Sequence, residues 1–349
     1  MRVVITGATG NVGSALVTAL AADPAVDSVV GVARRHPGPA YPLEGFVQAD
    51  VSRDDLRDAF AGADAVVHLA WEIQPSRDRA RLWRTNVQGT QRVVDAALGA
   101  GVPRLVVASS IGVYSAGPKT RLVDETWPRD GIPSSTYSRH KAEIERALDE
   151  VEQRAPALRI IRMRPALIFQ RSSATEQRKL FAGPFVPGRL LRRGLLRVLP
   201  DVPGLAFQAV HATDVAEAYR LAVHSPDARG AYNVASEPVL GMPSIAASRH
   251  ARTIAVPRSI ARPAFAAAYA LRLHPSEPSW LDVGLDTPLV SSQRITMELG
   301  WQPRVSALDT INEVVDGLVA GEGGRTDPLT PDDGLIGRLR ELREGVGRR

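Results

Sequence analysis

Residues 1–17, MRVVITGATGNVGSALV, decide the fold of this chain. An apolar, β-prone run at residues 3–5 leads through a glycine-spaced turn into residues that suit a helix. A strand, a tight glycine turn and a helix start in this order are typical of a dinucleotide-binding βαβ unit. In such a unit Gly7 permits the turn, Gly10 lets the backbone approach a pyrophosphate, and Gly13 allows the helix to pack closely on the strand. The phosphates would bind N–H groups at the positive end of the helix.

The composition indicates a soluble globular chain. Of its 349 residues, 44% are hydrophobic and 23% are charged, which suits one large domain or two modest ones. There is no cysteine, so disulfides and thiolate catalysis are excluded, and we expect a cytoplasmic location. The histidines are dispersed and no apolar run is long enough to span a membrane, so we predict no metal site and no membrane association. The 43 basic residues are nearly matched by 38 acidic ones, so we do not expect nucleic-acid binding.

Apolar runs that alternate with helical segments predict a parallel sheet flanked by helices, a doubly wound α/β fold of the Rossmann type. Beyond the first strand, these runs lie at residues 26–33, 45–51, 63–70, 104–110 and 158–165. After Ile168 the alternation stops. We therefore expect an NAD(P)-binding domain at residues 1–165, with 206–236 returning to it, and a smaller α/β substrate-binding region at 166–205 and 237–318. Residues 319–349 are expected to form a linker and a mobile, Arg-rich tail.

The end of the second predicted strand bears on the choice of cofactor. An acidic residue is expected there when the ribose 2′-hydroxyl of NAD is bound. This chain has Arg34 and Arg35 instead, whose guanidiniums can grip a 2′-phosphate. This favours NADP over NAD, and NAD is the alternative cofactor. The structural alternative is that the two arginines lie in a solvated loop and bind no cofactor. Asp50, which ends the third predicted strand, is either an adenine contact or a turn residue.

Several polar residues have structural interpretations. Ser52 is a plausible N-cap of the helix that follows the third strand, and Thr213 or Asp214 is expected to cap a later helix. His68 lies in an apolar strand with no partner spacing, so we interpret it as a core histidine rather than a catalytic one. Asn86 falls within a predicted helix, where asparagine is disfavoured, and this predicts a buried hydrogen-bonding role.

Two further features fall near the predicted ligand-binding edge of the sheet. Ser109 and Ser110 end the fifth predicted strand, at the carboxyl edge where ligands bind. Tyr137 and Lys141 are four residues apart, which places both on one face of a helix. The spacing alone is equally consistent with a surface tyrosine and a solvated lysine that have no catalytic role.

The ordered set of these segments resembles the extended short-chain dehydrogenase/reductase family over roughly residues 1–315. The segments that carry the resemblance are residues 6–13, 68–70, 86–90, 109–110, 113–114, 137–141, 164–165, 211–216, 232–234 and 299–303. The resemblance implies that Ser110, Tyr137 and Lys141 are catalytic. With the two arginines, the predicted cofactor-binding residues are Gly7, Thr9, Gly10, Asn11, Val12, Gly13, Arg34, Arg35, Asp50, Val51, Leu69, Ala70, Ser109, Tyr137, Lys141 and Pro165.

These residues suit hydride transfer, which requires a proton at the substrate oxygen. The pKa of a free tyrosine is about 10, so we expect the Lys141 ammonium to lower that of Tyr137. Tyr137 would act as general acid and base, Lys141 would also bind the nicotinamide ribose, and Ser110 would donate to the substrate oxygen. The sequence thus predicts an NAD(P)-dependent oxidoreductase acting on a carbonyl or alcohol.

Two other functions stay open. An NAD-dependent sugar-nucleotide epimerase would use the same residues, although Ser115 stands where such epimerases usually have glycine. A non-catalytic NADP-sensing or interaction protein would retain only the fold. Ser110 is not threonine and no Asp-Glu pair follows it, which counts against dehydratase chemistry.

Seven basic residues between 171 and 197 indicate either an anionic small-molecule substrate or a solvated, mobile loop. A homodimer is a further expectation.

Overall fold

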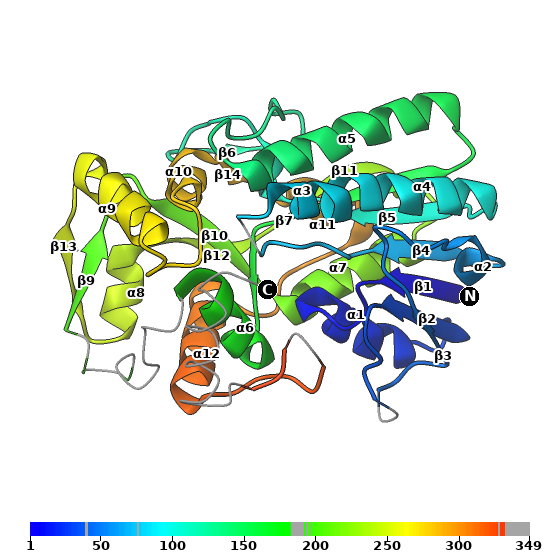
Figure 1. The fold of residues 1–349 in the computed structure, drawn as a ribbon, viewed down its shortest axis with the longest axis horizontal. Coiled ribbons are helices and arrows are strands. Elements are labelled where there is room, and N and C mark those ends of the chain that lie inside the picture. Colours follow the sequence, from blue (N-terminus) through cyan, green and yellow to red (C-terminus); the bar gives the residue numbers. More distant parts are fainter. Residues whose placement is uncertain are drawn as a thin grey trace.

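The chain is built on one large parallel sheet of seven strands (Figure 1). The computed structural model describes residues 1–38, 41–74, 77–182, 192, 195, 197–326 and 329–331. Along the sheet, the strand order is β11-β7-β5-β4-β1-β2-β3. The strands are β1 (Arg2–Thr6), β2 (Ser28–Ala33), β3 (Gly45–Gln48), β4 (Ala65–His68), β5 (Arg104–Ala108), β7 (Arg159–Pro165) and β11 (Gly230–Val234). All neighbouring pairs in this sheet are parallel, which confirms the predicted Rossmann-type fold.

The alternation of side chains along the strands creates two separate cores. Val3 and Ile5 of β1 point to one face, where they join apolar residues of α1 (Asn11–Ala21) and α7 (Ala212–His224). Val4 points to the opposite face, against α4 (Gly89–Gly99) and α5 (Thr136–Arg154). Figure 1 shows α4 and α5 on one side of the sheet and α1 on the other. Since both faces are covered by helices, the middle positions of β1, β2, β4 and β5 are apolar on both faces rather than alternating with polar residues.

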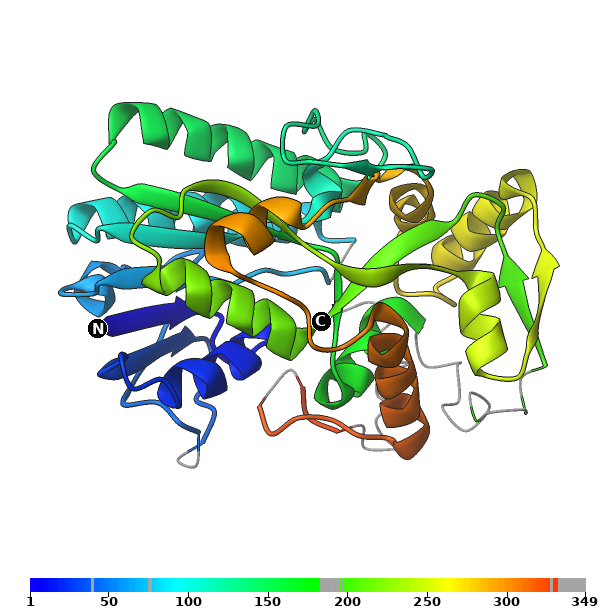
Figure 2. The ribbon, with the colours of Figure 1, turned by 180° about the vertical axis from the view of Figure 1, so that it is seen from behind.

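A smaller region lies beyond the carboxyl ends of the large sheet (Figure 2). Its strands are β8 (Leu167–Phe169), β9 (Val198–Asp201), β10 (Ala206–His211), β12 (Ser236–Gly241) and β13 (Arg252–Ala255), and its helices include α8 (Met242–Ser248), α9 (Arg258–Ala270), α10 (Ser279–Asp286) and α12 (Ala307–Ala320). β10 pairs with β8 and β12, and β9 pairs with β13. Of the segment expected to return to the first domain, β11 therefore joins the large sheet and β10 joins the smaller one. Among the described helices, none is long and apolar enough to cross a membrane.

The remaining short elements lie between the larger ones along the chain. They are α2 (Arg57–Phe60), α3 (Arg79–Trp83), β6 (Leu122–Val123), α6 (Ala174–Gln177), β14 (Leu289–Val290) and α11 (Gln293–Leu299). β6 and β14 form a two-stranded parallel ladder that ties the loop after β5 to the chain between α10 and α11. This loop precedes α5, so the ladder links the start of that helix to the smaller region.

Two predicted helix starts are wrong. The helix after β3 begins at Arg57, because Ser52 instead donates its N–H (2.9 Å) and its hydroxyl (2.7 Å) to Asp50 in a turn. α7 begins at Ala212, and the N-cap is His211, whose ring nitrogen accepts a hydrogen bond from the N–H of Thr213. Asp214 accepts a hydrogen bond from the backbone N–H of Val305 (3.0 Å) and so anchors a distant loop.

Part of the segment predicted as a linker packs against the first turn. The hydroxyl of Thr326 donates to the carbonyl of Thr9 (2.8 Å), and both Thr326 and Leu329 are buried. Glu322 forms an ion pair with Arg171 at 2.6 Å. The region 322–326 is therefore held by specific contacts, whereas the predicted mobile tail at residues 332–349 lies outside the described residues.

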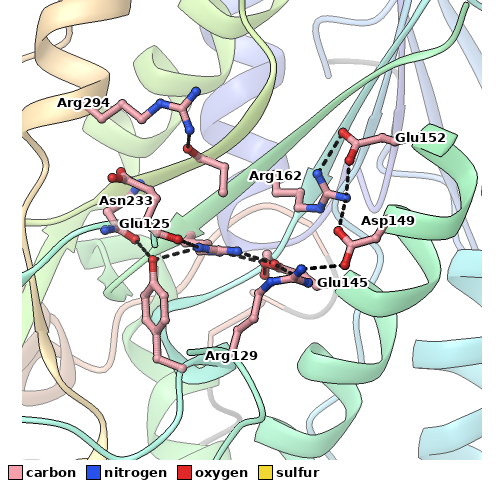
Figure 3. Close-up of polar contacts among 12 residues, drawn as sticks. Glu125, Arg129, Glu145, Asp149, Glu152, Arg162, Asn233 and Arg294 are labelled. Atoms are coloured by element: carbon pink, nitrogen blue, oxygen red, sulfur yellow. Dashed lines mark hydrogen bonds and ion pairs between the residues drawn. The ribbon is translucent and has the colours of Figure 1, made fainter. Parts of the chain in front are cut away.

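A buried ion pair fixes α5 to the sheet (Figure 3). Arg164 of β7 donates through Nε (2.8 Å) and through Nη2 to the two oxygens of Glu145, and both side chains are almost fully buried. Its Nη1 also donates to the hydroxyl of Tyr114 (2.9 Å). Burial acts to raise the pKa of Glu145, but the hydrogen bonds and charge of Arg164 bring it below its usual value. The pair thereby sets the position of the helix that carries Tyr137.

We expect Glu145→Ala to lower the free energy of unfolding by about 3–5 kcal/mol, because it leaves the Arg164 charge buried without its partner. Urea unfolding followed by circular dichroism measures this loss. Glu143→Gln on the same helix removes only the exposed pair with Arg146 and should change stability by less than about 1 kcal/mol. Equal losses in the two variants would contradict the assignment.

Candidate active site

Two glycines in the turn after β1 are required by packing. Gly7 has a φ of +76°, and a Cβ there would lie 2.7 Å from the backbone nitrogen of Ala70. A Cβ on Gly13 would lie 2.2 Å from the carbonyl oxygen of Gly7. The backbone after β4 and the first turn of α1 therefore both pack directly on the glycine turn, as the sequence predicts for Gly7 and Gly13.

Gly10 has a different environment, which fits a phosphate group. Among the described residues, a Cβ on Gly10 would meet only the Gly7 carbonyl oxygen, at 3.4 Å. Gly10 is the N-cap of α1, and no side chain of the described part of the chain caps this helix start. The first N–H groups of a helix have no intrahelical partner, and they favour an anion. The turn therefore fits the pyrophosphate of a dinucleotide.

The neighbouring turn residues have mainly structural contacts. The side chain of Asn11 donates to the carbonyl of Ile168 (3.2 Å) and accepts from Gln170 (2.9 Å), which joins the turn to β8. Val12 packs against the core beside α1. At the end of β4, Leu69 donates its N–H to Thr6 (2.9 Å).

The carboxyl ends of β2 and β3 carry the residues predicted to bind the adenosine end. Arg34 is exposed and forms an ion pair with Glu72, which follows β4, at 2.8 Å. Arg35 is also exposed. Asp50 is bonded to Ser52, and although burial acts to raise its pKa, these hydrogen bonds and the charge of Arg34 lower it. The structure thus brings Arg34 and Asp50 into electrostatic contact. Glu72 was not predicted from the sequence, although it lies just after a strand on the ligand-binding edge.

Ser110, Tyr137 and Lys141 meet at the carboxyl end of β5. Tyr137 lies in the first turn of α5, and its ring packs on Gly112, where a Cβ would be 2.8 Å from the ring. The Ser110 side chain lies beside the Tyr137 ring next to Gly112, and its hydroxyl accepts a hydrogen bond from the N–H of Gly112 (3.0 Å). Lys141, one turn further along α5, donates to the carbonyl of Ala108 (2.7 Å). The structure therefore groups the three residues as the sequence predicts.

Burial shifts the pKa values of this group toward the neutral forms. It raises the pKa of Tyr137 to about 12, against the opposing effect of the nearby Ser110 hydroxyl. It lowers the pKa of Lys141 to about 7, although the charge of Glu145 acts in the other direction. The expected lowering of the Tyr137 pKa by Lys141 is therefore not found, because desolvation of the phenol dominates. Tyr137 carries its proton at neutral pH and can donate it.

Aromatic rings that the sequence did not predict enclose Tyr137. Trp71, after β4, meets the Tyr137 ring edge-on at 5.8 Å, and the Lys141 ammonium lies 3.4 Å from the centre of the Trp71 ring. Trp280 of α10 lies 5.0 Å from the Tyr137 ring on a tilted plane. Within the described part of the chain, the indole N–H of Trp71 is buried without a hydrogen-bond partner. A buried donor beside Lys141 fits a site that takes a polar ligand.

Two further residues singled out in the sequence, His68 and Asn86, are buried and form hydrogen bonds close to the site. His68 is buried between the hydroxyls of Thr6 (2.6 Å) and Thr90 (2.9 Å), and burial lowers its pKa to about 3. Asn86 accepts from the N–H of Glu72 (2.8 Å) and donates to its carbonyl (2.7 Å). The core histidine and the buried asparagine are therefore both confirmed.

Three predicted cofactor residues occupy supporting positions. Ser109 donates to Glu145 (2.5 Å), so its hydroxyl belongs to the ion pair that anchors α5. Val51 is buried and packs beside Gly89, where a Cβ would lie 3.1 Å from it. Pro165 ends β7, in register with Val234 of β11.

The fold agrees with comparisons to known proteins. The model of the NAD dependent epimerase/dehydratase family matches residues 3–235, so the chain belongs to this family. A 3-beta-hydroxysteroid dehydrogenase from Mycolicibacterium neoaurum is 32% identical over 200 residues, covering 52% of this chain and 51% of that protein. An L-arabinose 1-dehydrogenase (NAD(P)(+)) from Haloferax volcanii is 38% identical over 113 residues, covering 32% and 42%. The chain thus spans about half the length of these relatives or less.

Solved structures share the fold over nearly the whole chain. UDP-glucose 4-epimerase from Thermus thermophilus, solved with NAD, superposes with a TM-score of 0.67 and 24% identity, covering 91% of this chain and 99% of that one. MoeE5 in complex with UDP-glucuronic acid and NAD gives a TM-score of 0.69 and 21% identity, with 91% and 98% covered. At these identities the likeness establishes the fold alone.

Gly10→Ala tests the phosphate-binding turn. The added methyl meets only one backbone atom among the described residues, so we expect the melting temperature to stay near that of the wild type. It would occupy the space next to the helix start, so the Kd for NADPH and NADH should rise about tenfold or more, which corresponds to about 1.4 kcal/mol. Calorimetric titration measures this change.

Gly13→Ala is the matched control. Its methyl would collide with the Gly7 carbonyl, so we expect a loss of about 1–3 kcal/mol in unfolding free energy. Tight dinucleotide binding by Gly10→Ala would contradict a phosphate site at this turn.

The lowered pKa of Lys141 predicts a pH-dependent contribution to stability. Between about pH 7 and 10.5 the unfolded chain keeps this proton while the folded chain has lost it, so the unfolding free energy rises with pH in this range. Lys141→Met removes this contribution. The stability of the wild type relative to the variant should therefore increase from pH 7 to about pH 9, measured by urea unfolding at each pH. A difference that does not change with pH would refute the shift.

Proposed function

We propose that this chain is an NAD(P)-dependent oxidoreductase that transfers a hydride between a nicotinamide cofactor and the carbonyl or alcohol of a small organic substrate. The observation that carries the proposal is the meeting of Ser110, Tyr137 and Lys141 at the carboxyl edge of the sheet. The open turn at Gly10 lies on the same edge, after β1. Ligands of doubly wound sheets bind along this edge.

Each residue has a defined role in the proposal. The bound cofactor supplies or accepts the hydride. Tyr137 holds its proton until the substrate oxygen develops negative charge, and then donates it. Ser110 donates to the same oxygen and fixes its position beside Tyr137. Lys141 binds the ribose next to the nicotinamide, and its ammonium stabilises the phenolate that Tyr137 becomes.

The proposed cofactor is NADP, with NAD as the alternative. Arg34 and Arg35 are exposed at the end of β2, and no acidic side chain follows that strand before Glu44. Guanidiniums bind phosphate monoesters through paired hydrogen bonds. The relatives named above and the family model support a dependence on NAD or NADP without separating the two.

An NAD-dependent sugar-nucleotide epimerase is the second candidate, and the shared fold of the UDP-sugar enzymes favours it. Such an enzyme would use the same three residues and retain its cofactor through purification.

An anionic substrate would need free cations near the site. Of the seven basic residues in the stretch, Arg171 is paired with Glu322, Arg178 is buried and Lys179 is half-buried. Arg192 and Arg197 are exposed, and Arg189 and Arg193 lie outside the described residues. A non-catalytic sensing role is disfavoured by the complete Ser-Tyr-Lys group. A homodimer and a cytoplasmic location stay predictions.

Tyr137→Phe tests the catalytic role. The test begins with a screen of carbonyl and alcohol compounds with both cofactors, in which the absorbance of reduced nicotinamide is monitored. We expect this screen to identify a substrate. On that substrate the variant should lose about 10²–10⁴-fold in kcat, because the proton donor is gone. Its Kd for cofactor should stay near the wild-type value, measured by calorimetry. Turnover at a near wild-type rate would disprove the assignment.

A further inference from the structure

Glu72 is a buried carboxylate shared by two arginines from different elements. It follows β4, and its side chain is only 9% exposed. Arg34 reaches it from the end of β2 (2.8 Å), and Arg81 reaches it from α3 (2.7 Å). This arrangement connects the candidate adenosine end of the site to the loop that carries Trp71.

The two arginines hold Glu72 unequally. Arg81 donates through Nε (3.0 Å) and Nη2 (2.7 Å) to different oxygens, and the hydroxyl of Thr85 adds a longer contact (3.4 Å). Arg34 donates through a single nitrogen, and its side chain is 53% exposed. If Arg34 moves to another anion, Glu72 keeps its bidentate ion pair with Arg81 and is not left as an unpaired buried charge.

The backbone around Glu72 is fixed. Asn86 bonds both the N–H and the carbonyl of Glu72, and Asn86 itself is buried. The carboxylate therefore stays at a set place while the half-exposed Arg34 has freedom to turn. Glu72 holds the Arg34 guanidinium at the carboxyl end of β2, where its charge also acts on Asp50.

We propose that Glu72 is a specificity-determining residue for the cofactor, acting as a resident anion that competes with a ribose 2′-phosphate for Arg34. This deepens the proposed function and rests on its dinucleotide site. A 2′-phosphate must take Arg34 from Glu72 or share the guanidinium with that carboxylate. NADH has a hydroxyl at this position and does not compete for Arg34. Glu72 thus reduces the preference for NADP that Arg34 and Arg35 create.

Glu72→Gln tests the proposal through binding alone. Glutamine keeps the size of the side chain and removes its charge, so Arg34 and Arg81 lose their counter-ion. We expect the Kd for NADPH to fall roughly three- to tenfold and the Kd for NADH to change less than about twofold, since only the former adds charge at this position. Calorimetric titration of the full chain with each dinucleotide measures both values.

The double variant Arg34→Gln/Glu72→Gln separates this mechanism from a general effect. If Glu72 acts through Arg34, the gain for NADPH disappears in the Arg34→Gln background. Glu298→Gln is the matched control, because Glu298 pairs with Arg294 (2.9 Å) on α11. It should leave both Kd values unchanged. If Glu72→Gln does not fold, Glu72→Asp withdraws the carboxylate from Arg34 and should shift the ratio the same way to a smaller extent.

The outcomes distinguish the two proposals. Equal changes for NADPH and NADH in Glu72→Gln, or a gain that persists without Arg34, would overturn the role of Glu72 while leaving the oxidoreductase intact. Failure of the wild-type protein to bind either dinucleotide would overturn the proposed function, and the role of Glu72 with it. A selective gain for NADPH that depends on Arg34 supports both.

Discussion

The close approach of three backbone segments at the end of β1 constrains the rest of the structure. The turn at Gly7 lies against the backbone of Ala70, and the start of α1 at Gly13 lies against the carbonyl of Gly7. No side chain larger than hydrogen fits at either contact. This packing holds the first turn of α1 and the chain after β4, from which Trp71 and Glu72 follow, against the same glycine turn. The candidate binding surface follows from these contacts.

The proposed catalytic group depends on a second anchor in the same sheet. α5 carries Tyr137 and Lys141, and the buried pair between Arg164 and Glu145 ties that helix to β7. Buried ion pairs contribute little net stability, but they tolerate little displacement, since each charge needs the other. Ser109 adds a hydrogen bond from the end of β5 to the same carboxylate. The geometry that brings Ser110 beside Tyr137 is thus maintained by buried polar groups behind it.

The sequence predicted what depends on local pattern, and it missed what depends on pairing across the fold. The apolar runs gave the parallel sheet, and the glycine spacing gave the turn, because period and backbone freedom are properties of short segments. The starts of two helices were wrong, since Ser52 and Asp214 found partners that their spacing did not show. Trp280 and Glu72 were missed for the same reason: Tyr137 and Trp280 are distant in sequence, and so are Arg34 and Glu72.

The pKa shifts of the site indicate how it can carry a proton. Burial acts against the charged form of both groups: it raises the pKa of Tyr137 to about 12 and lowers the pKa of Lys141 to about 7. When Tyr137 gives up its proton, the new phenolate favours the charged form of Lys141, which favours the phenolate in turn. The two groups therefore titrate as a coupled pair, and their attraction is realised only after the proton has moved. In the proposed reaction this attraction stabilises the later state selectively, which is the condition for lowering a barrier.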